Sequence, residues 1–122
     1  SLLFPSGSWK VNDNGKKAIV ELAKVLVKQS DIQIMVEGHA DNVPYRGTGL
    51  IKDNWDLSVM RATAIVRILA NNKGLKANRI TAAGKGSHSP LVENNSNENR
   101  AINRRTEIIL SPNMDKLMEL LD

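Results

Sequence analysis

An aspartate and an arginine, each beside the end of a predicted element, are the residues of this chain best suited to bind a ligand. Asp41 follows the run Gly38-His39-Ala40, and Arg61 lies in the motif Asn54-Trp55-Asp56-Leu57-Ser58-Val59-Met60-Arg61-Ala62. A carboxylate and a guanidinium held close together can grip a small zwitterion, which offers one ammonium and one carboxylate. This chemistry is typical of binding, and no neighbouring pattern requires catalysis.

Arg61 is expected on the apolar face of a helix that runs from about Asn54 to Asn72. The apolar residues that fall at helical spacing on that face are Leu57, Ala64, Ile65 and Ile68. A guanidinium beside apolar side chains loses solvation unless an oxygen atom meets it. Two interpretations remain open: an internal ion pair with Asp41 or Asp56, or a bidentate clamp for a ligand carboxylate, which the planar fork of arginine suits.

Asp41 is expected at the carboxyl edge of a sheet, because it follows an alternating apolar strand over residues 32–37 and the chain-turning Gly38. Ligands of α/β proteins commonly bind at that edge. A loop aspartate is more often a turn-former, so Asp41 gains its weight from being paired with Arg61. The loop from Asp41 to Asp53 is long for a small domain, and such loops are often functional.

Strands and helices alternate along the rest of the chain. Besides residues 54–72, the expected helices run from Asn12 or Asp13 to about Gln29, from Glu98 to Arg104 and from Asp115 to Leu121. The expected strands cover residues 2–4, 32–37, 79–83 and 106–110. Lys73-Gly74 is expected to cap the second helix. The pattern predicts an α/β (α+β) fold, a mixed sheet with helices packed on it.

Composition narrows the class of protein. The 122 residues predict one domain, and 41% hydrophobic with 25% charged residues is typical of a globular chain. The chain has no cysteine, which excludes disulfides, thiolate metal sites and thiol nucleophiles. No apolar run is long enough to cross a bilayer. The net charge of +4 favours anionic partners, although the basic residues are scattered among acidic ones.

Three further patterns have simpler interpretations. A metal-dependent hydrolase that uses His39, Asp41 and His88 is an alternative function from another class of protein. The two histidines lack the spacing typical of metal ligands, which argues against it. Gly84-Lys85-Gly86-Ser87 is an incomplete phosphate loop and fits a tight turn better. Asn103-Arg104-Arg105 and the net charge leave a nucleic-acid-binding domain as a further alternative, without aromatic residues to stack bases.

Four separate motifs together resemble the OmpA-like C-terminal peptidoglycan-binding domain, the OmpA/MotB superfamily. The motifs are Gly38-His39-Ala40-Asp41-Asn42, Asn54-x-x-Leu57-Ser58-x-x-Arg61-Ala62, Arg79-Ile80-x-x-x-Gly84-x-Gly86 and Asn103-Arg104-Arg105-x-Glu107-Ile108. The match covers about residues 15–110, in the family's order and spacing. Residues 111–122 are a C-terminal extension of a single domain over residues 1–122.

The resemblance implies a βαβαβ-type sheet and a non-enzymatic site for the diaminopimelate of the peptidoglycan stem peptide. The family's ligand-binding residues fall on Asp41, Arg61, Asn54, Ala40, Leu57 and either Arg104 or Arg105. Ala40 departs from the threonine usual in the family, so one hydroxyl contact is lost. No cofactor and no metal are implied. If Arg61 is the clamp, Arg61→Ala is expected to abolish binding and leave the fold intact.

The resemblance also implies a cellular context. The domain is expected to anchor an outer-membrane or envelope protein to the cell wall in the periplasm of a Gram-negative bacterium, attached to the outer membrane as in lipoproteins. A stator-type (MotB-like) inner-membrane anchor is the alternative. Peptidoglycan is the expected partner, nucleic acid is not, and a homodimer is an option. Residues 1–5 do not resemble a signal peptide, so membrane association is expected only through segments outside this chain.

Overall fold

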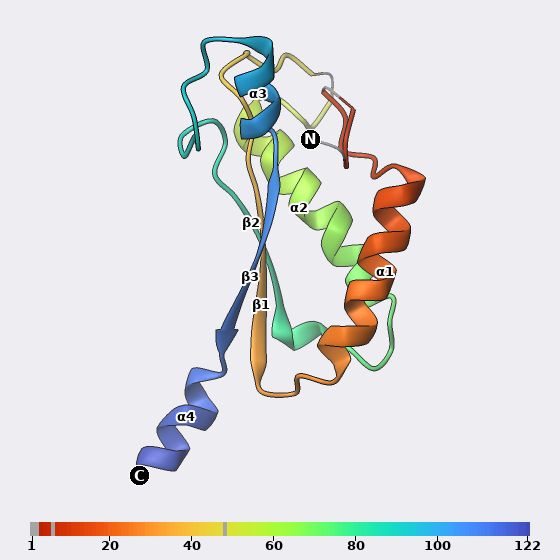
Figure 1. The fold of residues 1–122 in the computed structure, drawn as a ribbon, viewed down its shortest axis with the longest axis vertical. Helices are drawn as coiled ribbons and strands as arrows, with labels where there is room; N and C mark the ends of the chain where they lie inside the picture. The colour runs from red at the N-terminus through yellow and green to blue at the C-terminus, as the bar shows by residue number, and fades with distance from the viewer. Residues whose placement is uncertain (1–2, 6, 48) are drawn as a thin grey trace.

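A mixed three-stranded sheet with two long helices on one face forms the body of the protein (Figure 1). The computed structural model describes residues 3–5, 7–47 and 49–122. In chain order the elements are α1 (Asp13–Val27), β1 (Ile32–Gly38), α2 (Asn54–Ala70), the 3₁₀ turn η1 (Ala77–Arg79), β2 (Ile80–Gly84), α3 (Asn97–Asn103), β3 (Thr106–Pro112) and α4 (Met114–Leu121). From β1 to β3 the order is βαβαβ, so the predicted fold is confirmed.

The central strand β1 pairs in parallel with β2 and antiparallel with β3. The carboxyl ends of β1 and β2 therefore lie at the same end of the sheet, together with the start of β3 and with α3 (Figure 1). Two segments that could bear ligand-binding side chains leave the sheet at this end, one after β1 and one after β2. This arrangement confirms the predicted position of Asp41 at the carboxyl edge.

The core lies between the sheet and the two long helices. Its buried aliphatic and aromatic residues are Phe4, Ile19, Ala23, Leu26, Ile34, Val36, Ala62, Ile65, Leu69 and Leu75. Ile34 and Val36 alternate with the exposed Met35 along β1, as a strand with one buried face requires. Arg67 is exposed on α2, whereas Arg61 is buried beside the core.

Side chains that accept hydrogen bonds from backbone amides cap the starts of α1 and α2. The Asn12 side chain accepts a hydrogen bond from the Gly15 amide at the start of α1, and Asp53 accepts one from the Asp56 amide at the start of α2. Asp56 in turn accepts a hydrogen bond from the Lys52 amide, which resembles a capping box.

Two local predictions were wrong. The helix α2 ends at Ala70 with Asn71 as its cap, and Gly74 lacks the positive φ of a glycine cap. A Cβ atom on Gly74 would lie 3.1 Å from Cγ1 of Val27 on α1, a tight contact. Leu3 and Phe4 form a bend and not a strand, because the buried Phe4 ring packs into the core; Leu2 lies outside the described residues.

The last helix, α4, extends away from the sheet at the end opposite to α3 (Figure 1). It follows β3 after Asn113, whose amide donates to the Asp31 carbonyl. Met118 and Leu121 are exposed on it. Among the described residues, no helix combines the length and the apolar character that a membrane span requires.

Gly38 is required by a close approach of β1 to α2, and its backbone does not adopt the positive φ of a chain-turning glycine. A Cβ atom on Gly38 would lie 2.0 Å from the carbonyl oxygen of Ser58, a backbone atom that cannot turn aside. The carbonyl group of Gly38 accepts a hydrogen bond from the Lys85 amide. The expectation of a sharp turn at Gly38 was therefore wrong in mechanism, although the glycine is needed.

We predict that Gly38→Ala lowers the free energy of unfolding by about 3 kcal/mol, the upper end of the usual cost of overpacking. Gly49→Ala is the matched control. A Cβ at Gly49 meets nothing within 4 Å, and only its φ of 72° opposes the substitution, at about 1 kcal/mol. Urea denaturation of both variants measures the difference. Equal losses would contradict the proposed contact with Ser58.

Candidate functional site

A pocket of about 360 Å³ opens beyond the carboxyl end of β1. Its walls come from the segment after β1, the first half of α2, α3 and the N-terminal segment. The lining residues are Gly7, Ala40, Asp41, Val43, Pro44, Tyr45, Arg46, Asn54, Leu57, Arg61, Asn97, Arg100 and Arg104. Six of the seven residues predicted for the site line this pocket, and Arg105 does not.

Asp41 is buried in the pocket wall and is held by two hydrogen bonds. Its Oδ1 accepts from the Val43 amide at 3.0 Å, and its Oδ2 accepts from Arg104 Nη1 at 2.6 Å. Only 7% of Asp41 is exposed, so the charge-assisted bond to Arg104 stabilises the ionised carboxylate where water cannot. Each oxygen retains a further lone pair, so Asp41 can accept from a ligand without losing these two partners.

Arg61 is 2% exposed and is satisfied by backbone carbonyl oxygens. Its Nε donates to the Ser8 carbonyl at 2.9 Å and its Nη2 to the Pro5 carbonyl at 3.3 Å. The guanidinium carbon also lies 5.4 Å from the centre of the Phe4 ring, a cation–π distance. Arg61 forms no ion pair with Asp41 or Asp56, so the internal ion pair considered from the sequence is absent between these residues.

The electrostatic surroundings of Arg61 are mixed. Burial lowers the pKa of the Arg61 guanidinium most strongly, and the neighbouring Arg104 lowers it further, whereas Asp41 and Tyr45 raise it. Because arginine ordinarily titrates far above neutrality, Arg61 stays charged. Its Nη1 makes no hydrogen bond within the described residues. A buried cation in the wall of a pocket suits an anionic ligand group.

Asn54, Ala40 and Leu57 shape the pocket. The Asn54 amide donates to the Asp41 carbonyl at 3.3 Å and to the Val43 carbonyl at 2.9 Å, and so fixes the segment that carries the carboxylate. The Ala40 amide donates to the Gly86 carbonyl at 2.8 Å, which ties this segment to the turn after β2. Asn54 therefore holds Asp41 in place from the first turn of α2.

The neighbouring Arg104 and Arg105 serve different parts of the molecule. Arg104, at the end of α3, lines the pocket and pairs with Asp41. Arg105 points elsewhere: its Nε donates to Glu107 at 2.9 Å and its Nη2 to the Ser89 carbonyl at 3.0 Å. Between the two arginines that the motif offered, the structure brings only Arg104 to the pocket.

Sequence reasoning missed Arg100, Asn97 and Tyr45 as pocket residues. Arg100 lies one helical turn before Arg104 on α3, so the spacing of four residues could have revealed it. Its Nε donates to Asn42 Oδ1 at 3.1 Å. Tyr45 lies in the loop after β1, where no periodic pattern indicates which side chains face inward.

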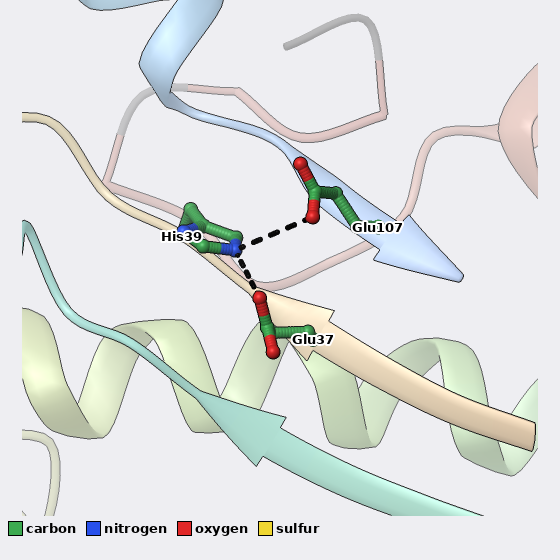
Figure 2. Close-up of side chains that lie close together, drawn as sticks. All are labelled: Glu37, His39 and Glu107. Atoms are coloured by element: carbon green, nitrogen blue, oxygen red, sulfur yellow. Dashed lines mark hydrogen bonds and ion pairs between the residues drawn. The ribbon is translucent and has the colours of Figure 1, made fainter. Parts of the chain in front are cut away.

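His39 is buried outside the pocket, next to Glu37 and Glu107 (Figure 2). Its Nε2 is 2.8 Å from Glu37 Oε1 and 4.0 Å from Glu107 Oε2. Glu37 and Glu107 are directly opposite each other on β1 and β3. Like charges at such positions repel, and Arg105 offsets this repulsion by pairing with Glu107.

Glu37, His39 and Glu107 are the described residues whose donor atoms come close enough to hold a metal ion, all within 4.8 Å of one another. Their surroundings fit a metal poorly. A metal at Nε2 would put the proton of His39 on Nδ1, which is buried without a hydrogen-bond partner, whereas metal-bound histidines usually donate from that nitrogen. Arg105 already occupies Glu107. We interpret the cluster as a link between β1 and β3.

The other sequence hypotheses find no matching geometry in the described residues. His39, Asp41 and His88 do not form a metal-binding group, since His88 stacks on Trp55 with ring centres 4.8 Å apart. The Gly84-Lys85-Gly86-Ser87 segment is a tight turn, with φ of 60° at Gly86. The Gly86 amide donates to the buried Ser58 hydroxyl at 3.0 Å, so the turn is fastened to α2.

The burial of Arg61 changes one expectation. We predict that Arg61→Ala lowers the free energy of unfolding by about 2 kcal/mol, because the buried guanidinium and its hydrogen bonds to the Ser8 and Pro5 carbonyls are lost. The expectation that this variant leaves the fold intact is therefore revised. Arg67→Ala, on the exposed side of the same helix, is the control and should change stability by less than about 0.5 kcal/mol. Thermal and urea denaturation compare them, and equal stabilities would contradict a structural role for Arg61.

A second prediction concerns acid stability. The hydrogen bond from Arg105 lowers the pKa of Glu107, burial opposes this, and the charges of Arg105 and His39 lower it further. A lowered pKa in the folded state stabilises the protein above the unfolded value and loses that contribution as pH falls through the folded value. The stability difference between wild type and Glu107→Gln should therefore be full above about pH 5 and be lost as the pH falls through the lowered pKa of Glu107.

Urea denaturation at a series of pH values measures this difference. Glu21→Gln removes an equally charged but highly exposed carboxylate on α1, whose partner Lys24 is also exposed, and serves as the control. A stability difference for Glu107→Gln that is the same at every pH would show that the Arg105 bond does not depend on the charge of Glu107.

Comparison with known proteins finds a matching family model and several similar proteins. The OmpA family model matches residues 3–104. Motility protein B of Bacillus subtilis is 33% identical over 112 residues, 92% of this chain and 42% of the relative. The peptidoglycan-associated lipoprotein of Buchnera aphidicola is 34% identical over 109 residues, 89% of this chain and 60% of the relative. The chain thus spans only about half the length of these relatives.

Among solved structures, the cell wall anchor of the T6SS from Pseudomonas aeruginosa superposes with a TM-score of 0.77 and 39% identity, over 87% of this chain and 72% of that one. The shared fold and the match of the family model over residues 3–104 agree with the motifs that form the pocket. The chain belongs to the OmpA family.

Proposed function

We propose that the pocket binds the free zwitterionic end of diaminopimelate in a peptidoglycan stem peptide, and that the domain thereby attaches an envelope protein to the cell wall without a covalent bond. The observation that carries the proposal is that one pocket is lined by the buried carboxylate of Asp41 and by the buried guanidinium of Arg61. Asp41 is the only carboxylate among the residues that line it. Membership of the OmpA family supports the ligand class.

The charges of the pocket suit the two ends of a zwitterion. The ligand ammonium would donate a hydrogen bond to a remaining lone pair of Asp41. Asp41 would keep its hydrogen bonds from Val43 and Arg104. The ligand carboxylate would accept from Nη1 of Arg61, which makes no hydrogen bond to the residues that the structure describes. Because Arg61 and Asp41 are both held by backbone groups before any ligand arrives, little side-chain ordering opposes binding.

The proposed context is the periplasm. One relative is named as a peptidoglycan-associated lipoprotein and one solved structure is described as a cell wall anchor. We propose the outer-membrane anchor of the lipoprotein kind as the context. The stator kind is the competing proposal, favoured by the match to a motility protein. A lipid-attachment cysteine after a signal peptide in the full-length protein would support the first, and an uncleaved transmembrane helix the second.

A small ligand in a pocket of this size gives weak to moderate affinity for one site. Attachment to the wall would then depend on many weak sites acting at high local concentration.

We predict that wild-type protein co-sediments with purified diaminopimelate-type sacculi, and that Asp41→Asn lowers the affinity at least about tenfold. The amide keeps the shape of Asp41 and removes its charge, and a charge-assisted hydrogen bond contributes about 1.5–3 kcal/mol. Free diaminopimelic acid should release the wild-type protein, whereas 1,5-diaminopentane, which has the two amines but no carboxylate, should not.

Glu21→Gln, with the same change in net charge on the exposed side of α1, is the control and should bind as wild type does. Binding that survives Asp41→Asn but falls steeply with salt would instead indicate a polyanion site of the nucleic-acid kind. A wild-type protein that stays in the supernatant would overturn the proposal.

A further inference from the structure

The pocket carries more positive charge than a zwitterion needs. Its lining includes the guanidinium groups of Arg46, Arg61, Arg100 and Arg104 and the single carboxylate of Asp41, so four positive charges against one negative leave a surplus of three. The zwitterionic end of diaminopimelate has no net charge and would leave this surplus unchanged. Like charges at close range repel, as the lowering of the Arg61 pKa by Arg104 shows.

Arg100 is the member of this group that is oriented but not neutralised. Its Nε donates to Asn42 Oδ1 at 3.1 Å and its Nη1 contacts Asn97 Oδ1 at 3.5 Å. Both acceptors are uncharged amides, and Arg100 forms no ion pair with any carboxylate that the structure describes. Its Nη2 makes no hydrogen bond to the described residues.

The other cationic side chains of the pocket either have partners or are exposed to solvent. Arg104 pairs with Asp41, and Arg61 holds the Pro5 and Ser8 carbonyls and faces the zwitterion in the proposed function. Arg46 is exposed on the loop after β1, where solvent screens its charge. Arg100 is thus a positioned, partly buried cation whose counter-charge is missing, which is what a site for an external anion requires.

We infer that Arg100 binds a second free carboxylate of the same stem peptide, beyond the zwitterionic end, and that the domain selects acidic over amidated stem peptides. The inference rests on the proposed function. A stem peptide offers such a group in two places, the α-carboxylate of the glutamate that precedes diaminopimelate and, where diaminopimelate is the last residue, its own chain carboxylate. Either becomes an uncharged carboxamide on amidation, which removes the attraction to Arg100.

Three synthetic stem tripeptides distinguish these sources. One carries all carboxylates free, one has the glutamate α-carboxamide, and one has a carboxamide at the chain carboxyl of diaminopimelate with its zwitterionic end kept. Isothermal titration with the whole protein should give about tenfold weaker binding for one of the two amides than for the free acid, and that amide identifies the group facing Arg100.

Substitution of Arg100 tests whether this residue causes the difference in affinity between the free acid and the amide. Arg100→Gln should weaken binding of the free acid about tenfold and bring it to the level of the discriminated amide, whose own affinity changes less than about twofold, as a double-mutant cycle requires. Arg67→Gln loses the same charge on the exposed side of α2, outside this pocket, and should bind all three peptides as wild type does.

The outcomes separate this inference from the proposed function. Equal, measurable binding of all three peptides to wild type would overturn the inference and leave the proposed function standing. Discrimination that persists in Arg100→Gln would also overturn it, because another group would then read the carboxylate. Failure of wild type to bind any of the peptides, or sacculi, would overturn the proposed function and the inference with it.

Discussion

The contact between the end of β1 and the backbone of α2 is the constraint on which the site depends. Gly38 lies against the Ser58 carbonyl so closely that no side chain fits between them. Ser58 in turn accepts from the Gly86 amide, so both parallel strands end against the same turn of one helix. The segment that carries Asp41 and the helix that carries Arg61 therefore leave a shared point in fixed directions. A glycine and a buried serine position two charges that neither residue touches.

The two buried charges of the pocket are stabilised in different ways. Asp41 is stabilised by an opposite charge, whereas Arg61 is stabilised by carbonyl dipoles. Arg79, buried at the other end of the sheet, follows the second solution, with donors on the Ile32 and Gln29 carbonyls. A guanidinium bound by carbonyls is desolvated yet retains its full charge. It stays available to an anion in a way that an ion-paired guanidinium does not.

Most of the fold could be predicted because its signals are local. Caps such as Asn12, the alternation along β1 and the helical spacing around Ile65 each lie within a few residues. The end of α2 and the bend at Phe4 could not be, because packing against distant residues decides both. For the site, motif order identified Asp41 and Arg61 but not the partners of Arg61, which are backbone atoms more than 50 residues away.

The choice between Arg104 and Arg105 shows the same limit. The chain passes from α3 into β3 at these residues, and the period of side-chain directions changes from helical to alternating. Only the register of β3, with Glu107 opposite Glu37, shows that Arg105 shares a face with Glu107 and that Arg104 belongs to the pocket. Sequence spacing alone contains no information on that register.

The hydrogen bonds of Arg61 to Pro5 and Ser8 have a mechanical consequence. The N-terminal segment lies at the same end of the molecule as α3 and the pocket, while α4 extends from the other end (Figure 1). A tensile load applied through the N-terminal segment would pass directly to Arg61, which faces the ligand in the proposed function. A load applied through α4 would have to travel along the whole of β3 first.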